Sequence, residues 1–237
     1  MDDKAPAWDN RGMALLSTTD QQVLRETLDR MVRPVKVAFF TQAIGCDTCA
    51  ETKQILGELT SVSEKITVEE LNPVLDRDRA AQYGIDRAPA LVLLTGEGGD
   101  SRVRFLGTPA GYDFMAFVDA VLLVSGAAAQ ELSSATRERL SALTAPLDVR
   151  VFVTPTCGYC PRAVALANRL AFASPFVTAT TVQATEFYDL AREYRVSGVP
   201  KTVASNGKEV LGALPEAQFV AGLFDGEAGD DTESPEA

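Results

Sequence analysis

Residues 151–163 read Val151-Phe152-Val153-Thr154-Pro155-Thr156-Cys157-Gly158-Tyr159-Cys160-Pro161-Arg162-Ala163. A β-rich apolar run ends at Thr154, two cysteines follow at Cys-x-x-Cys spacing, and an Ala/Leu-rich segment of helical character continues to Ala173. A cysteine pair between a strand and a helix is typical of a redox-active dithiol rather than of a metal clip. Cys157 would meet the unpaired N–H groups of the helix N-terminus, which stabilise a thiolate. Cys160 lies about one turn further on, so the pair can close a small disulfide ring.

The chain contains this arrangement twice. All four cysteines fall into the pairs Cys46/Cys49 and Cys157/Cys160, and the first members of the pairs are 111 residues apart. The same offset of 111 residues relates three further pairs: Pro89 and Pro200, Tyr83 and Tyr194, and Asn72 and Gln183. A constant offset over such a distance indicates two copies of one fold.

These repeats predict the division of the chain. We expect an N-terminal arm over 1–14, a first unit over 15–126 and a second unit over 127–224. The final segment, 225–237, has six acidic and no basic residues, which predicts a disordered tail. The linker near 125–130 is short, so the two units should pack together.

Each unit is predicted to be α/β, with strands and helices following one another along the chain. The expected order is helix, strand, Cys-x-x-Cys helix, strand, helix, strand, strand, helix. The first helix is expected to begin at a capping box of Thr19 and Gln22. Its expected apolar face consists of Val23, Leu24, Leu28, Met31 and Val32. Asn206-Gly207 predicts a hairpin turn between the last two strands.

Composition excludes several classes of protein. The formal net charge of −11 argues against nucleic-acid binding, which needs basic patches. Histidine is absent, which removes His-based acid–base chemistry and His-containing metal sites. No run approaches the ~18 apolar residues of a membrane span. The first residues carry no secretory signal, so we expect a cytoplasmic protein, as a monomer or weak oligomer.

The main alternative for a Cys-x-x-Cys pair is half of a metal site. Between Cys49 and Cys157 lie 107 residues, against the ~15–20 of a zinc ribbon. Both pairs also have a proline 43 residues after their first cysteine, namely Pro89 and Pro200. We therefore expect no metal, and a four-cysteine iron–sulfur cluster is less favoured still because the pairs would have to meet across two units.

These features resemble the thioredoxin fold, whose cis-proline has its counterparts in Ala88-Pro89-Ala90 and Val199-Pro200-Lys201. The doubled pattern over about 15–224 resembles the two-domain protein disulfide oxidoreductases of archaea and some bacteria, also called glutaredoxin-like proteins. The stretches that carry this likeness are Phe39-Phe40-Thr41-Gln42, Tyr83-Gly84-Ile85-Asp86, Val151-Phe152-Val153-Thr154-Pro155-Thr156-Cys157 and Gly198-Val199-Pro200-Lys201-Thr202. The N-terminal domain of the alkyl hydroperoxide reductase flavoprotein shares the doubled fold but keeps a working cysteine pair only in its second copy.

The resemblance implies a thiol–disulfide oxidoreductase with two tandem thioredoxin-like folds. Cys157 and Cys46 are the expected nucleophiles, and Cys160 and Cys49 the expected resolving thiols. The expected substrate-binding residues are Pro200, Val199, Pro89, Ala88 and Tyr159. No cofactor is expected beyond the redox-active disulfides. The implied partners are protein disulfide substrates and a flavin-dependent thioredoxin reductase. Two alternatives stay open: a thiol-dependent chaperone or scaffold, and a dedicated electron carrier to a peroxidase.

Local charge predicts that the two sites differ. Asp47 follows Cys46 directly and disfavours a thiolate, so Cys157/Cys160 should carry most of the turnover. Glu186 is expected to be a helix-start charge without a catalytic part. Single-domain thioredoxins have an acid on the strand six residues before the first cysteine, where this chain has Phe40 and Val151. The route of the proton on the resolving cysteine is therefore left open.

Overall fold

The structure is a computed structural model that describes residues 16–127 and 132–225. The predicted arm over 1–14, part of the linker and residues 226–237 of the predicted tail lie outside the described residues. Asp225, the first residue of that predicted tail, is described, and its carboxylate accepts a hydrogen bond from Arg139.

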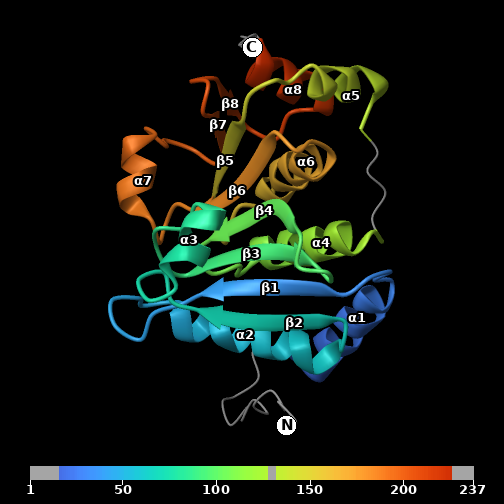
Figure 1. The fold of residues 1–237 in the computed structure, drawn as a ribbon, viewed down its shortest axis with the longest axis vertical. Helices are drawn as coiled ribbons and strands as arrows, with labels where there is room; N and C mark the ends of the chain where they lie inside the picture. Colours follow the sequence, from blue (N-terminus) through green and yellow to red (C-terminus); the bar gives the residue numbers. More distant parts are fainter. Residues whose placement is uncertain (1–15, 128–131, 226–237) are drawn as a thin grey trace, which may run out of the picture.

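The first unit follows the predicted order of elements (Figure 1). Its elements are α1 (Thr18–Asp29), β1 (Val35–Phe40), α2 (Cys49–Val62), β2 (Ile66–Leu71), α3 (Arg77–Tyr83), β3 (Ala90–Thr95), β4 (Asp100–Leu106) and α4 (Tyr112–Ser125). The second unit repeats them as α5 (Ser134–Ser141), β5 (Leu147–Val153), α6 (Cys160–Ala173), β6 (Val177–Gln183), α7 (Tyr188–Glu193), β7 (Lys201–Ala204), β8 (Glu209–Leu211) and α8 (Glu216–Phe224).

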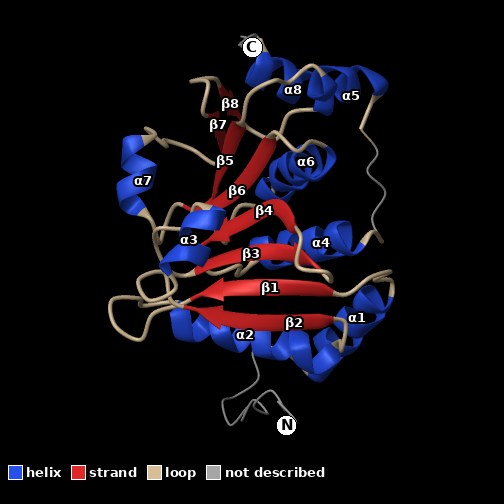
Figure 2. Ribbon diagram, viewed as in Figure 1, coloured by secondary structure: helices blue, strands red, loops and turns tan. Residues whose placement is uncertain are grey.

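The strands of both units form one continuous sheet, in the order β2-β1-β3-β4-β6-β5-β7-β8 (Figure 2). The units join where β4 pairs in parallel with β6, from Val103 opposite Ala179 to Leu106 opposite Val182. Within each unit the strands pair in the same way. β1 pairs in parallel with β2, as β5 does with β6, and β1 pairs antiparallel with β3, as β5 does with β7. The sheet is therefore mixed, and the two units pack together as the short linker predicts.

Successive strand residues bury opposite faces of the sheet, as the two-residue period of a strand requires. Phe39 belongs to a large apolar core that includes residues of α1, α2, α4, α5, α6 and α8. Phe40 belongs to a smaller core on the other face, beneath α3 and α7. Tyr83 packs edge-on against Phe40 in that smaller core, and Tyr194 packs against Phe152, so the two units repeat this aromatic pair.

Two predictions for the first helix, its capping box and its apolar face, differ from the structure. Its capping box is made by Ser17 and Asp20, not by Thr19 and Gln22, because the Ser17 hydroxyl accepts the Asp20 N–H while the Asp20 carboxylate reaches back to the Ser17 N–H. Leu24 and Leu28 are buried as predicted, but Val23 is 58% exposed, and Val32, which is 68% exposed, lies beyond the end of the helix at Asp29.

No helix among the described residues is long and apolar enough to cross a membrane.

Candidate functional site: two disulfides at one edge of the sheet

Both cysteine pairs lie at the same edge of the sheet. β1 runs opposite to β3, β3 opposite to β4, and β4, β6 and β5 run in parallel, so β1 and β5 point in the same direction. The first pair follows β1 and opens α2, and the second follows β5 and opens α6. Three strands separate β1 from β5, and four strand spacings of ~4.8 Å place the two sites roughly 19 Å apart along the sheet.

Each pair forms a disulfide, Cys46–Cys49 and Cys157–Cys160, with Cα atoms 5.5 Å apart in both. Cys46 and Cys157 are half-buried, whereas Cys49 and Cys160 are only 4% and 0% exposed. In each pair, the first cysteine is therefore partly exposed and the second is screened by the protein.

The helix N-terminus acts on the sulfur of the second pair. The N–H of Cys160 donates to Sγ of Cys157 at 3.1 Å. A sulfur that accepts a backbone N–H at a helix N-terminus is better able to carry negative charge. Within the described residues no N–H group donates to Sγ of Cys46, so the two first cysteines differ.

The two predicted prolines lie at the same edge as the cysteines. The peptide bonds Ala88–Pro89 and Val199–Pro200 are both cis. Strand register places Ala90 opposite Phe40 at the end of β1, and Lys201 opposite Phe152 near the end of β5. Both prolines are buried, and Ala88 and Val199 before them are half-buried.

Tyr159 is 69% exposed within the second motif. The structure thus brings the five predicted substrate-binding residues to the cysteine edge of the sheet, and their role in binding stays a prediction.

The first unit also contributes to the surroundings of the second motif. The N–H of Tyr112 donates to the carbonyl of Pro155 at 2.9 Å, just before Cys157. Gly111 has φ +59°, and a Cβ built on it would lie 2.2 Å from the same carbonyl oxygen. The backbone of the turn before α4 therefore packs directly on the loop that carries Cys157, at a distance that only glycine allows.

Asp113, close to this turn, is a buried acid that the sequence analysis did not single out. Its Oδ2 accepts a hydrogen bond from Nε2 of Gln183 at 2.7 Å, and its Oδ1 has no partner among the described residues. Burial raises the pKa of Asp113 to about 7, against the opposing effect of the Gln183 hydrogen bond. The protein therefore holds a carboxyl group that titrates near neutrality in the segment packed on the second motif.

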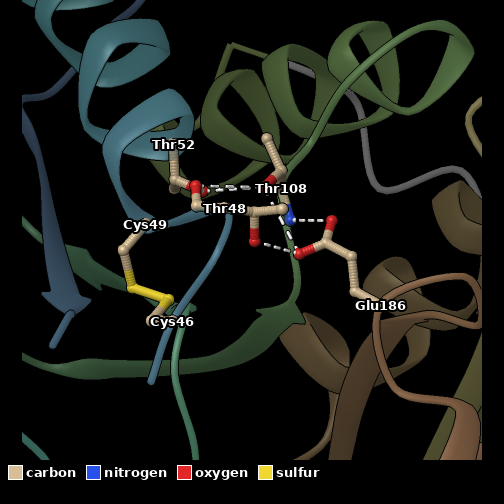
Figure 3. Close-up of a disulfide and its surroundings, with 6 residues drawn as sticks. All are labelled: Cys46, Thr48, Cys49, Thr52, Thr108 and Glu186. Carbon is tan, nitrogen blue, oxygen red and sulfur yellow. Dashed lines mark hydrogen bonds between the residues drawn. A yellow bond between two sulfur atoms is a disulfide. The ribbon is translucent and has the colours of Figure 1, made fainter. Parts of the chain in front are cut away.

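Glu186 corrects a further prediction. It lies in the turn before α7, yet its carboxylate accepts the Thr48 hydroxyl at 2.5 Å and the Thr108 N–H at 2.8 Å, both in the first unit (Figure 3). Glu186 is therefore a contact to the first cysteine motif and not a helix-start charge. Both Asp113 and Glu186 have partners at least 70 positions away in the chain, and no local pattern marks such contacts.

Among the described residues, no group of three or more Cys, His, Asp or Glu side chains is placed to hold a metal ion.

Fold and cysteine geometry together define a thioredoxin-fold protein with two dithiol sites. A family model described as a thioredoxin domain matches residues 147–225, the core of the second unit. A protein disulfide oxidoreductase from Aeropyrum pernix K1 is 30% identical in sequence and superposes with a TM-score of 0.78 over 86% of this chain and 90% of that one. The chain belongs to this family of two-unit, thioredoxin-fold protein disulfide oxidoreductases.

A second group of relatives is similar over the same span. The N-terminal domain of the alkyl hydroperoxide reductase AhpF from Enterococcus faecalis is 25% identical, with a TM-score of 0.80 over 88% of this chain and 99% of that one. The corresponding alkyl hydroperoxide reductase component of Escherichia coli K12 is 27% identical over 215 residues. That match takes in 90% of this chain but only 38% of the relative's length.

Proposed function

We propose that the protein is a cytoplasmic dithiol–disulfide oxidoreductase that acts on protein disulfides through both cysteine pairs. One observation carries this proposal above the others: in each motif the first cysteine is partly exposed and the second is buried at the start of a helix. That polarity is what attack followed by intramolecular resolution requires.

In the reductive direction the second site would act in two steps. The Cys157 thiolate attacks one sulfur of a client disulfide, forms a mixed disulfide and releases the other client sulfur as a thiolate. The Cys160 thiolate then attacks Sγ of Cys157, which closes the protein disulfide and releases the second client thiolate. The client gains two electrons and takes up two protons, and the protein dithiol is oxidised by the same two electrons.

The residues around the second site have separate roles in this proposal. The Cys160 N–H, 3.1 Å from Sγ of Cys157, stabilises the attacking thiolate. Val199, Pro200 and the exposed ring of Tyr159 border the place where an extended client segment would lie.

Cys46 and Cys49 would work in the same way at the first site, with Ala88 and Pro89 beside them. Electrons would enter from a flavin-dependent thioredoxin reductase, as in the family that the sequence resembles. This supply needs no cofactor on the chain besides its own disulfides.

A second candidate function is electron transfer to a peroxidase, and the similarity to the alkyl hydroperoxide reductase AhpF favours it. The dithiol chemistry would be the same, but the client would be one dedicated protein.

Insulin reduction with dithiothreitol as electron source tests the proposal. We expect catalysed turnover by the wild-type protein and none by a variant with all four cysteines replaced by serine. Wild-type protein that suppresses aggregation of unfolded clients without turnover would instead identify a chaperone. A protein that ignores insulin but oxidises its dithiols in the presence of a peroxidase disulfide would be a dedicated carrier.

A further inference from the structure

Glu186 belongs to the second unit but makes its hydrogen bonds in the first. It lies in the turn that follows β6, between the two cysteine sites. Its Oε2 accepts the hydroxyl of Thr48 at 2.5 Å, and its Oε1 accepts the N–H of Thr108 at 2.8 Å (Figure 3). Thr48 stands inside the motif Cys46-Asp47-Thr48-Cys49. A carboxylate of one unit is therefore bonded to the cysteine loop of the other.

The same loop is held from a second direction. The carbonyl oxygen of Thr48 accepts the N–H and the hydroxyl of Thr52, both at 2.9 Å, and the hydroxyl of Thr108 at 3.5 Å. The hydroxyls of Thr52 and Thr108 are themselves 2.9 Å apart. Figure 3 shows these groups converging beside the disulfide, with Glu186 entering from the opposite side. Glu186 thus completes a network that fixes both the side chain and the carbonyl of Thr48.

The second motif has a different residue at the same place. The counterpart of Thr48 is Tyr159, which follows Gly158 and is 69% exposed. The loop of the second motif is therefore not held by a carboxylate through this position, and the two sites differ in charge and in constraint.

A carboxylate in this position should shift the balance between disulfide and dithiol. The oxidised pair is neutral, whereas the reduced pair develops a thiolate, and a nearby negative charge disfavours that thiolate. The effect is larger where burial lowers the local dielectric. The network holds Thr48, in the loop between the two cysteines, while the pair is oxidised, so its hydrogen bonds favour the loop conformation of the disulfide as well.

We propose that Glu186 is a positioning residue for the first site: through Thr48 it makes Cys46/Cys49 a stronger reductant than its motif alone would be. The inference rests on the proposed function of this site as a redox couple. It also makes the first site dependent on the second unit, since the group that tunes it comes from there.

The test is a redox titration of the intact four-cysteine protein in dithiothreitol buffers, with each pair quantified separately by alkylation and peptide mass spectrometry. Glu186→Gln removes the charge but can keep hydrogen bonds to both partners. We expect it to shift the equilibrium of Cys46/Cys49 about tenfold toward the dithiol, which is ~30 mV for a two-electron couple. Thr48→Val should shift it in the same direction by about threefold or more. Thr48→Ser, which keeps the hydroxyl, should stay within about twofold of wild type.

Two controls separate this effect from a general loosening of the protein. Asp189→Asn also removes one acidic charge and weakens a contact between the units, the ion pair of Asp189 with Arg87 at 2.8 Å. It should leave the first site within about twofold of wild type, and all these variants should leave Cys157/Cys160 equally unchanged. As a second readout, the pH midpoint for alkylation of Cys46 in reduced protein should fall in Glu186→Gln.

The titration distinguishes the role of Glu186 from the redox function of Cys46/Cys49. If Cys46/Cys49 titrates as a two-electron couple with the same midpoint in wild type and Glu186→Gln, the role assigned to Glu186 is wrong while the redox function stands. An equal shift in Asp189→Asn would also overturn it. If the first pair does not titrate at all, the proposed function of that site fails and the role of Glu186 fails with it.

Discussion

Replacing Asp113 by asparagine should change how the stability of the protein depends on pH. Burial raises the pKa of Asp113 from 3.8 to about 7 in the folded protein, while the unfolded chain keeps the ordinary value. The folded state therefore holds the proton more tightly than the unfolded state does. Stability is lost as pH rises above about 4, and the loss is complete once pH exceeds about 7.

The size of this loss follows from the shift in pKa. About three pKa units at 1.36 kcal/mol each correspond to roughly 4 kcal/mol at pH 8. The amide in Asp113→Asn cannot ionise, and its Oδ1 can still accept the Nε2–H of Gln183, as Oδ2 of Asp113 does at 2.7 Å. The free energy of unfolding of the variant, relative to wild type, should thus rise by about 3 to 4 kcal/mol between pH 4 and pH 8.

Urea unfolding of the oxidised proteins at a series of pH values measures this difference. All other titrating groups are common to both proteins and cancel in the comparison. Burying the amide of the Asp113→Asn variant has a cost of its own, but that cost is the same at every pH and leaves the slope intact. A relative change below about 1 kcal/mol across this range would show that Asp113 is ionised at neutrality and would refute the reasoning.

Two further predictions concern the motifs and their packing. Cys157→Ser should remove most of the insulin-reducing activity, and Cys46→Ser should remove less of it. Of the two first cysteines, only Cys157 accepts a helix N–H among the described residues, and only Cys46 has an acidic neighbour within its motif. Equal losses in the initial rate would show that local charge does not determine which site is more active. Gly111→Ala should destabilise the protein by about 2 to 4 kcal/mol, because its Cβ would lie 2.2 Å from the carbonyl of Pro155 at a positive φ. Gly57→Ala is the matched control, because Gly57 lies in α2 and its added Cβ would have nothing within 4 Å. This variant should stabilise the protein by about 0.5 to 1 kcal/mol. A melting temperature of Gly111→Ala above that of Gly57→Ala would contradict the packing described for the turn before α4.

The sequence predicts the repeat well because the same short motifs occur twice at a fixed offset along the chain. The offset of 111 residues that joins Cys46 to Cys157 also joins the two cis-prolines, and the structure has the same order of elements in both units.

The parts that the sequence does not predict depend on contacts between distant segments. The continuous sheet requires β4 to pair with β6, and no residue pattern in either strand predicts this pairing. Glu186 resembles a helix-start charge in its local sequence, and only the joined sheet brings it to Thr48, 138 positions away. Asp113 likewise gains its raised pKa from burial between the units, which its neighbours in sequence do not reveal.

The proposed mechanism requires both cysteine pairs to be redox couples, and counting the thiols across a redox titration measures this. Intact protein is equilibrated in dithiothreitol buffers, alkylated and weighed by mass spectrometry, with zinc measured on the same samples. We expect two thiols at each pair on reduction, four in all, and full return to the two disulfides on oxidation. A pair that stays reduced across the titration, or one that retains stoichiometric zinc under mild oxidant, would contradict it.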